Sequence, residues 1–175
     1  MWGVSVIHMK LEGDMNWQEV CEHPILQNLP FKIELNKDGE IIMNAGQVNH
    51  SLYAWEIMRL LEQFLKGGKC PPEFPIMTSD NVKSPDVAWI SNERLQSIWG
   101  MSASTIAPEI CVEIKSPSNT RKKLHEKAQL YFEKAATEVW FCSEEGKMEF
   151  YSSEDKLVNS VLVPEFPEFI DLQPA

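Results

Sequence analysis

The stretch Ile110-Cys111-Val112-Glu113-Ile114-Lys115 is the part of this 175-residue chain that decides its fold. Its β-branched and apolar side chains predict a buried strand. Side chains two positions apart on a strand point to the same face, so Glu113 and Lys115 project together while Val112 and Ile114 project to the other face. A carboxylate beside an ammonium group on such a strand indicates either a catalytic pair or an ordinary solvated ion pair.

The stretch Pro85-Asp86-Val87-Ala88-Trp89-Ile90 predicts an earlier strand, and Asp86 at its start can lie beside Glu113. Hydrolysis of a phosphodiester needs a divalent cation, and Mg²⁺ is usually held by one or two carboxylates together with water. We therefore expect Asp86 and Glu113 to bind Mg²⁺ or Mn²⁺. Lys115 is expected to orient the attacking water and to stabilise the transition state.

A helix over residues 119–136 is predicted to follow, with its break and N-cap supplied by Ser116-Pro117-Ser118. Its inner apolar stripe consists of Leu124, Ala128, Tyr131 and Ala135. Lys127 lies on the same stripe, three residues after Leu124 and four before Tyr131. Burial of a lysine is costly unless it meets a charge, so Lys127 either extends to the surface or reaches a carboxylate cluster or a phosphate.

The remaining periodicity predicts a mixture of strands and helices, which is typical of an α/β or α+β sandwich around one sheet. A 17–21 helix capped by Asp14 or Asn16 precedes a hairpin of strands 31–35 and 41–43. Two apolar stripes predict a helix over 48–66 that is buried over most of its circumference and ends at Gly67-Gly68. A short helix at 93–98 and strands at 138–143 and 148–151 complete the pattern.

The length indicates a single domain, 1–175. Within it we expect an N-terminal helix and hairpin at about 14–45, a core at about 46–151 and a C-terminal extension at 152–175.

Other candidate residues have two interpretations each. Glu34 is either a third carboxylate of the site or a solvated edge residue. Glu56 is expected to form a surface ion pair, and a capping or core role is favoured for His50 over a metal role. The Arg121-Lys122-Lys123 run can contact a phosphate backbone or form a solvated face.

Composition limits the classes of function. The net charge of −10 argues against tight, non-specific coating of DNA. The four cysteines form no CxxC pair, which predicts a disulfide-free cytoplasmic protein rather than a zinc-binding one. No apolar run is long enough for a transmembrane helix, no secretory signal is expected, and P-loop, GxGxxG, GxSxG and HExxH motifs are missing.

Several stretches resemble the Uma-type family of restriction endonucleases, a branch of the PD-(D/E)xK nuclease superfamily. They are Trp17-Gln18-Glu19-Val20, Leu29-Pro30-Phe31-Lys32-Ile33-Glu34-Leu35, Asn49-His50-Ser51, Pro85-Asp86-Val87-Ala88-Trp89, the run from Pro108 to Ser118, Lys127 with Tyr131, and Glu138-Val139-Trp140. The resemblance implies a restriction-endonuclease-like fold with a central mixed sheet flanked by helices, divalent-metal binding and homodimers. The N-terminal hairpin is expected as an addition to that fold.

The resemblance also implies roles for single residues. It places Asp86 and Glu113 on the metal, and it matches Glu34 to the family's N-terminal glutamate. Many members have an apolar residue where this chain has Lys115, and they keep the helix lysine that Lys127 matches, so either lysine can be catalytic. The chain departs from the family at Ala136, where a glycine is common, and at Cys142-Ser143, where an acidic residue and a proline are common.

Taken together, the sequence predicts a Mg²⁺-dependent endonuclease that hydrolyses DNA as a homodimer. Two alternatives stay open. The first is a nuclease-like fold that serves as a non-catalytic binding or interaction module, which the acidic net charge favours. The second is a metal-dependent hydrolase of a small phosphodiester.

Overall fold

The computed structural model describes residues 7–9, 15–27, 29, 32–44, 47–116 and 119–172. Its centre is a six-stranded sheet in the order β11-β10-β9-β8-β7-β4. In chain order these strands are β4 (Gly68–Lys69), β7 (Val87–Ser91), β8 (Ile110–Ile114), β9 (Glu138–Cys142), β10 (Met148–Tyr151) and β11 (Lys156–Leu157). Strands β8 and β9 are parallel and the other neighbours are antiparallel, so the sheet is mixed, as predicted.

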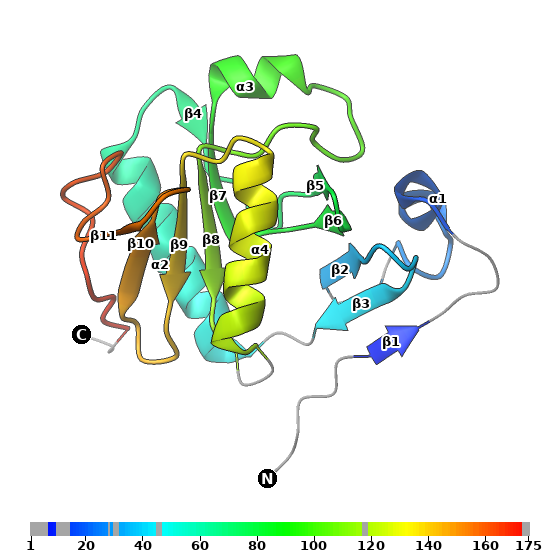
Figure 1. Cartoon of the computed structure of the whole chain (residues 1–175), viewed down its shortest axis with the longest axis horizontal. Coiled ribbons are helices and arrows are strands. Elements are labelled where there is room, and N and C mark those ends of the chain that lie inside the picture. Colours follow the sequence, from blue (N-terminus) through cyan, green and yellow to red (C-terminus); the bar gives the residue numbers. More distant parts are fainter. Residues whose placement is uncertain are drawn as a thin grey trace, which may run out of the picture.

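Two helices cover the two faces of this sheet (Figure 1). Helix α2 (Val48–Phe64) packs with Ile110, Val112 and Ile114, and helix α4 (Arg121–Glu133) packs on the face that carries Cys111. The alternation of β8 therefore serves both layers, because its odd-numbered and even-numbered side chains enter different clusters. Glu113 belongs to the α4 face, where an apolar neighbour would otherwise pack.

The register between β7 and β8 fixes the position of Asp86. Val87 pairs with Val112 in this antiparallel ladder, so one further step places Asp86 opposite Glu113. The Asp86 N–H also donates to the Val112 carbonyl at 2.9 Å, which ties the start of β7 to β8. The strands thus bring together two carboxylates that are far apart in the sequence.

The first part of the chain forms what we call the N-terminal lobe: β1 (Ile7–Met9), α1 (Trp17–Glu22), β2 (Lys32–Leu35) and β3 (Ile41–Asn44). Its strands form a separate three-stranded sheet in the order β1-β3-β2, which lies beside the main sheet rather than in it (Figure 1). The lobe has its own hydrophobic cluster, centred on Val20, Leu26, Leu35, Ile41 and Met43. The predicted hairpin is confirmed as β2 and β3, and β1 is an unpredicted third strand.

A short two-stranded sheet lies next to this lobe. It consists of β5 (Ile76–Thr78) and β6 (Asn81–Lys83), joined by a turn at Ser79 and Asp80. Helix α3 (Asn92–Ser97) follows β7, close to the predicted 93–98 helix. Segment β6 leads directly to Asp86, so the small sheet connects the lobe to the strand ends that carry the site.

The structure corrects the predicted helices. Helix α2 ends at Phe64 rather than near residue 66, and its Val48, Leu52 and Trp55 are exposed, so the prediction of burial over most of the circumference was wrong. Only the stripe of Tyr53, Ile57 and Leu61 is buried, because a single sheet face covers the helix.

Helix α4 is also shorter than predicted. Thr120 rather than Ser116 or Ser118 caps it, since its side chain accepts from the Lys123 N–H. The helix ends at Glu133, and Ala135 has φ 69° and is exposed, so it does not extend the inner stripe. Helix α1 is capped by Asn16, one of the two predicted caps, in a capping box with Glu19.

Two further observations concern the chain as a whole. The four cysteines are free thiols, of which Cys111 and Cys142 are buried. Among the residues that the structure describes, no helix has the length and apolar character needed to cross a membrane.

Candidate active site

Three carboxylates are buried where the N-terminal lobe meets the ends of β7 and β8. Glu34 lies on β2, Asp86 directly precedes β7 and Glu113 lies on β8. Their exposed fractions are 4%, 7% and 1%. Since ionised carboxylates are almost never this buried without partners, their contacts decide what the cluster can do.

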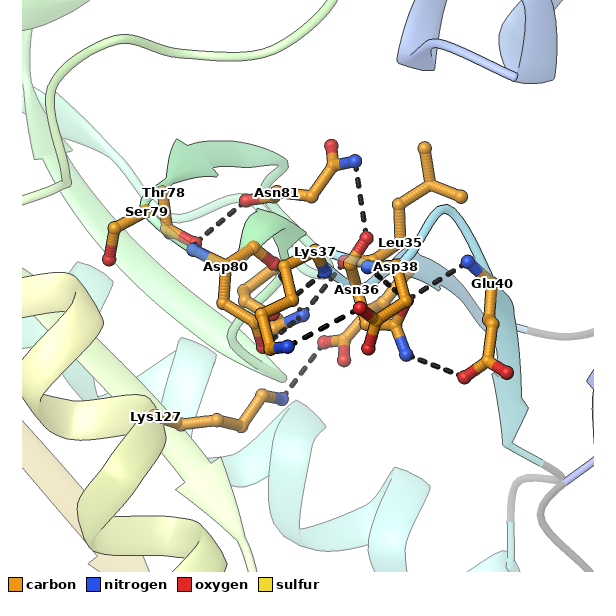
Figure 2. A network of polar contacts seen from close by, with 12 residues as sticks. Leu35, Asn36, Lys37, Asp38, Glu40, Thr78, Ser79, Asp80, Asn81 and Lys127 are labelled. Atoms are coloured by element: carbon orange, nitrogen blue, oxygen red, sulfur yellow. Dashed lines mark hydrogen bonds and ion pairs between the residues drawn. The ribbon is translucent and has the colours of Figure 1, made fainter. Parts of the chain in front are cut away.

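Lys127 joins two of these carboxylates. Its Nζ lies 2.8 Å from Glu34 Oε1 and 3.0 and 3.1 Å from the two oxygens of Glu113. The side chain extends from α4 toward the hairpin (Figure 2). Lys127 therefore does not extend to the surface. It reaches a carboxylate cluster, which was one of the two outcomes predicted for a lysine on the inner stripe.

Lys32 and His50 contact the third carboxylate. Lys32 Nζ donates to Asp86 Oδ1 at 2.7 Å and lies 3.8 Å from Glu34 Oε1. His50 Nε2, from the first turn of α2, lies 3.2 Å from Asp86 Oδ2. The cluster thus alternates acids and bases, and its groups come from β2, α2, β8, α4 and the segment before β7.

Neutral donors fix each carboxylate further. The Tyr131 hydroxyl donates to Glu113 Oε1 at 2.6 Å, and the Ser84 N–H donates to Glu34 Oε1 at 3.0 Å. The Ile114 N–H donates to Asp86 Oδ2 at 2.7 Å. These donors come from backbone or from a fully buried side chain, so they hold the carboxylates in fixed orientations.

The two glutamates have opposite pKa shifts. Burial raises the pKa of Glu113, and the neighbouring charge of Asp86 adds to this against the opposing charge of Lys127. Burial also raises the pKa of Glu34, but the charges of Lys127 and Lys32 outweigh it, so the pKa of Glu34 is lowered overall. Different protonation tendencies in one cluster are typical of sites that divide acid and base roles.

The contacts between Asp86 and its partners shift the pKa of each group toward its charged form. Burial raises the pKa of Asp86, but the charge of Lys32 and the hydrogen bond from His50 lower it well below its usual range. That hydrogen bond is also the main cause that raises the pKa of His50. For Lys127, burial lowers the pKa, but the charges of Glu113 and Glu34 raise it overall.

The structure brings together four of the residues singled out from the sequence, namely Glu34, Asp86, Glu113 and Lys127. Lys115 is placed differently: it lies one residue past β8, is exposed, and its charge helps to lower the pKa of Glu145. Its backbone N–H still donates to the Cys142 carbonyl at 2.8 Å, next to the end of β9. Glu56 pairs with Arg59 at 2.6 Å on the outer surface of α2, as expected.

Lys32, His50 and Tyr131 were not assigned to the site from the sequence. Lys32 was detectable, because it is two residues from Glu34 on the same strand face. His50 and Tyr131 have no such signal beyond their presence in the family-like stretches, since their contacts depend on how α2 and α4 pack. The structure places His50 beside Asp86, which differs from the capping or core role that was favoured.

The donor set suits a hard cation in its chemistry. Carboxylate oxygens are the ligands that Mg²⁺ prefers, and Asp86 and Glu113 are adjacent across the β7–β8 ladder. In the described part of the chain, no three His, Cys, Asp or Glu side chains are grouped closely enough to hold a metal together. Lys32 and Lys127 contact these acids, so a bound cation would have to replace some of their ion pairs. Asp86 and Glu113 thus offer carboxylate oxygens of the kind that Mg²⁺ binds, and in the structure these oxygens contact Lys32, His50, Lys127 and Tyr131.

Comparisons with known proteins bear on the fold and the family of the chain. A solved structure described as a putative nuclease belonging to DUF820, from Anabaena variabilis ATCC 29413, is similar with a TM-score of 0.66. The two chains are 18% identical, and the match covers 83% of this chain and 84% of that one, which shows a shared fold. A comparison with curated proteins finds no match. The model of the Uma2 family, described as "Putative restriction endonuclease", matches residues 17–175, and the chain belongs to this family.

Proposed function

We propose that this protein is a Mg²⁺-dependent endonuclease that hydrolyses phosphodiester bonds in DNA. The observation that carries the proposal is the buried cluster of Asp86, Glu113, Glu34 and Lys127. Membership of a restriction-endonuclease family and the nuclease-like fold support nuclease activity. A binding module has no need to bury three carboxylates and two lysines at a cost in desolvation, whereas a hydrolytic site uses such groups directly.

The proposed roles follow from the contacts. Asp86 and Glu113 would hold Mg²⁺ or Mn²⁺, which would neutralise the scissile phosphate and lower the pKa of a bound water. Lys127 would orient that water and face the charge that develops on the phosphate. Glu34 would keep the Lys127 ammonium group in place through their 2.8 Å ion pair. Lys115 is the alternative catalytic lysine, and it would have to turn inward from its exposed position.

We further propose that the enzyme is a cytoplasmic homodimer. A two-fold symmetric pair of sites matches the two strands of a duplex, which suits double-strand cleavage. Sedimentation velocity at micromolar concentration would test this, since a 20.1 kDa particle would contradict the dimer.

The test of the activity is a nicking assay on supercoiled plasmid with Mg²⁺, with Mn²⁺ and with a chelator. We expect cleavage only with metal, and a loss of about 10³-fold or more in Glu113→Gln. Glu149→Gln is the matched control, because Glu149 lies on β10, two strands from β8 in the same sheet, and pairs with Arg121 and Lys156 outside the site. Equal cleavage by Glu113→Gln and the wild type would contradict the assignment.

A second measurement separates metal binding from cleavage. Ligand binding to the folded state raises its thermal stability, so Mg²⁺ or Mn²⁺ should raise the Tm of the wild type and not that of Asp86→Asn. The net charge of −10 favours a non-catalytic binding module as the second candidate. Stabilisation by metal without plasmid cleavage would support that module instead of the nuclease.

A further inference from the structure

The N-terminal lobe contributes Lys32 and Glu34 to the site, yet among the described residues its buried apolar side chains form a cluster apart from the other two. Its hydrophobic cluster contains residues of the lobe alone, whereas α2, α4 and the main sheet form two other clusters. Its β-sheet is also separate from both other sheets. The lobe must therefore be held in place largely by other kinds of contact.

Three of the polar contacts between the lobe and the rest of the chain follow an antiparallel order along two short segments. Lys32 pairs with Asp86, Glu34 accepts from the Ser84 N–H, and the Leu35 carbonyl accepts from Lys83. As β2 advances by three residues, its partner segment retreats by three. Each contact involves at least one side chain, so this docking follows the order of a strand pairing but is not a backbone ladder.

Lys83 is the buried centre of this docking. It is 4% exposed, and its Nζ donates to the Leu35 and Asp80 carbonyls, both at 2.7 Å. The same nitrogen lies 3.0 Å from Asp80 Oδ2. An ammonium group has three donors, and these three oxygens satisfy all of them. The outcome is a fixed distance between the end of β2 and the β5–β6 turn.

The same turn also contacts the hairpin turn (Figure 2). Asp80 Oδ1 accepts from the Lys37 N–H at 2.8 Å, and Asn81 Nδ2 donates to the Asn36 carbonyl at 3.3 Å. Asp80 therefore contacts both the lobe and Lys83. Lys83 directly precedes Ser84, whose N–H donates to Glu34. The contacts of Lys83 therefore lie next to the site.

We propose that Lys83 is a positioning residue of the active site, through which the N-terminal lobe is docked and Glu34 is held against Lys127. This role rests on the proposed nuclease function. Lys83 acts indirectly, because its partners are Leu35 and Asp80 rather than the carboxylates of the cluster. Leu35, which it holds, is the neighbour of Glu34 in the chain. A shift of about 1 Å in a positioned group can reduce a rate by about 100-fold.

Lys83→Met is the first variant, because methionine keeps most of the volume and removes the three donors. We expect kcat for plasmid nicking to fall by about 10-fold or more, with KM for DNA changed by less than about 3-fold. Lys147→Met is the matched control, since Lys147 is an exposed lysine beyond the site, and it should behave as the wild type. Asp80→Ala is a second variant that weakens the same contacts from a partly exposed position, in case Lys83→Met does not fold.

Hydrogen exchange provides a readout that does not depend on activity. The Ser84 and Lys37 amides donate across the interface, so undocking should accelerate their exchange by about 10-fold or more, while amides of β9 stay unchanged. Unchanged exchange at Ser84 and Lys37 in both variants would overturn the docking role. Faster exchange with an unchanged kcat would overturn the positioning role.

A wild-type protein that cleaves no DNA would contradict the nuclease proposal separately. Exchange at Ser84 and Lys37 would then still support or overturn the docking by Lys83, because that measurement requires no cleavage.

Discussion

At the scale of single residues, the ion pair between Lys127 and Glu113 compensates a buried charge. The Glu113 carboxylate is almost fully buried, and it is stabilised by Lys127 from α4 and by the Tyr131 hydroxyl. A buried ion pair contributes little net stability compared with apolar packing, but removal of one partner leaves an uncompensated charge. The pair is therefore poorly explained by stability alone, which is why we propose a chemical role for both residues.

Lys127→Met is expected to lose both nicking activity and stability. We expect a loss of about 3 kcal/mol at neutral pH, because two buried carboxylates lose their shared partner. The lowered pKa of Glu34 means that its ion pair stabilises the fold above the ordinary glutamate value of 4.5 and that this contribution is lost as the pH falls below it. The stability difference between variant and wild type should therefore shrink between pH 5 and pH 3 in urea titrations, and it should be constant from pH 8 to pH 6.

Lys115→Met is the control for this prediction. Lys115 is exposed, so the substitution should change stability by less than about 0.5 kcal/mol. A loss of nicking in Lys115→Met with full activity in Lys127→Met would show that the strand lysine is the catalytic one.

At the scale of elements, strand β9 holds the C-terminal segment through one buried carboxylate. Glu138 accepts hydrogen bonds from Trp140 Nε1 and Ser160 Oγ on one oxygen, and from the Val161 and Leu162 N–H groups on the other. These donors fix the chain after β11, and the nearby Val163 and Phe166 enter the cluster that α2 covers. The segment thus belongs to the packed fold rather than trailing from it.

Glu138→Gln is expected to destabilise the protein by about 2 kcal/mol or more, because an amide NH₂ replaces an acceptor that faces donors. Limited proteolysis should cleave the segment after residue 152 faster, and urea denaturation should show the loss. Glu165→Gln, which alters an exposed glutamate of the same segment, is the control. Equal stability of the two variants would mean that Glu138 does not hold the segment.

The whole molecule carries a net charge of −10, although its proposed substrate is a polyanion. The cluster adds three carboxylates against Lys32, Lys127 and His50, so little local positive charge is left to attract a phosphate. We therefore expect the metal to be needed for DNA binding as well as for cleavage.

Fluorescence anisotropy with a labelled duplex tests this expectation. Addition of chelator should weaken binding by about 10-fold or more, since a bound cation would otherwise offset the site's carboxylates. Glu149→Gln should respond to chelator as the wild type does. Binding that is equally tight with and without metal would show that other basic residues hold the DNA.

Much of this architecture was predictable because it depends on local patterns. The alternation around Glu113, the Asp86 strand and the stripe position of Lys127 each follow from short-range periodicity, and all three converge in the structure. The exposed face of α2 was not predictable, because apolar periodicity does not reveal how many layers cover a helix. The placement of Lys115 depends on β8 ending one residue earlier than the pattern predicts.

The contribution of the lobe was harder to predict. Lys32 reaches Asp86 across 54 positions of sequence, and that contact depends on how the lobe docks. Docking through lysines and carbonyl oxygens leaves no apolar signature on β2 or β6. The family-like stretch around Glu34 was the one indication that this strand matters.

The separate core of the N-terminal lobe bears on how the protein is made. The N-terminal lobe and the rest of the chain can each collapse around their own apolar side chains. The interface between these two bodies forms only when their polar groups come within hydrogen-bonding distance. The interface would thus form late, after both bodies have folded. A chain emerging from the ribosome carries Glu34 long before Lys127 has been synthesised, so an unfinished polypeptide lacks an ion pair that joins the two bodies.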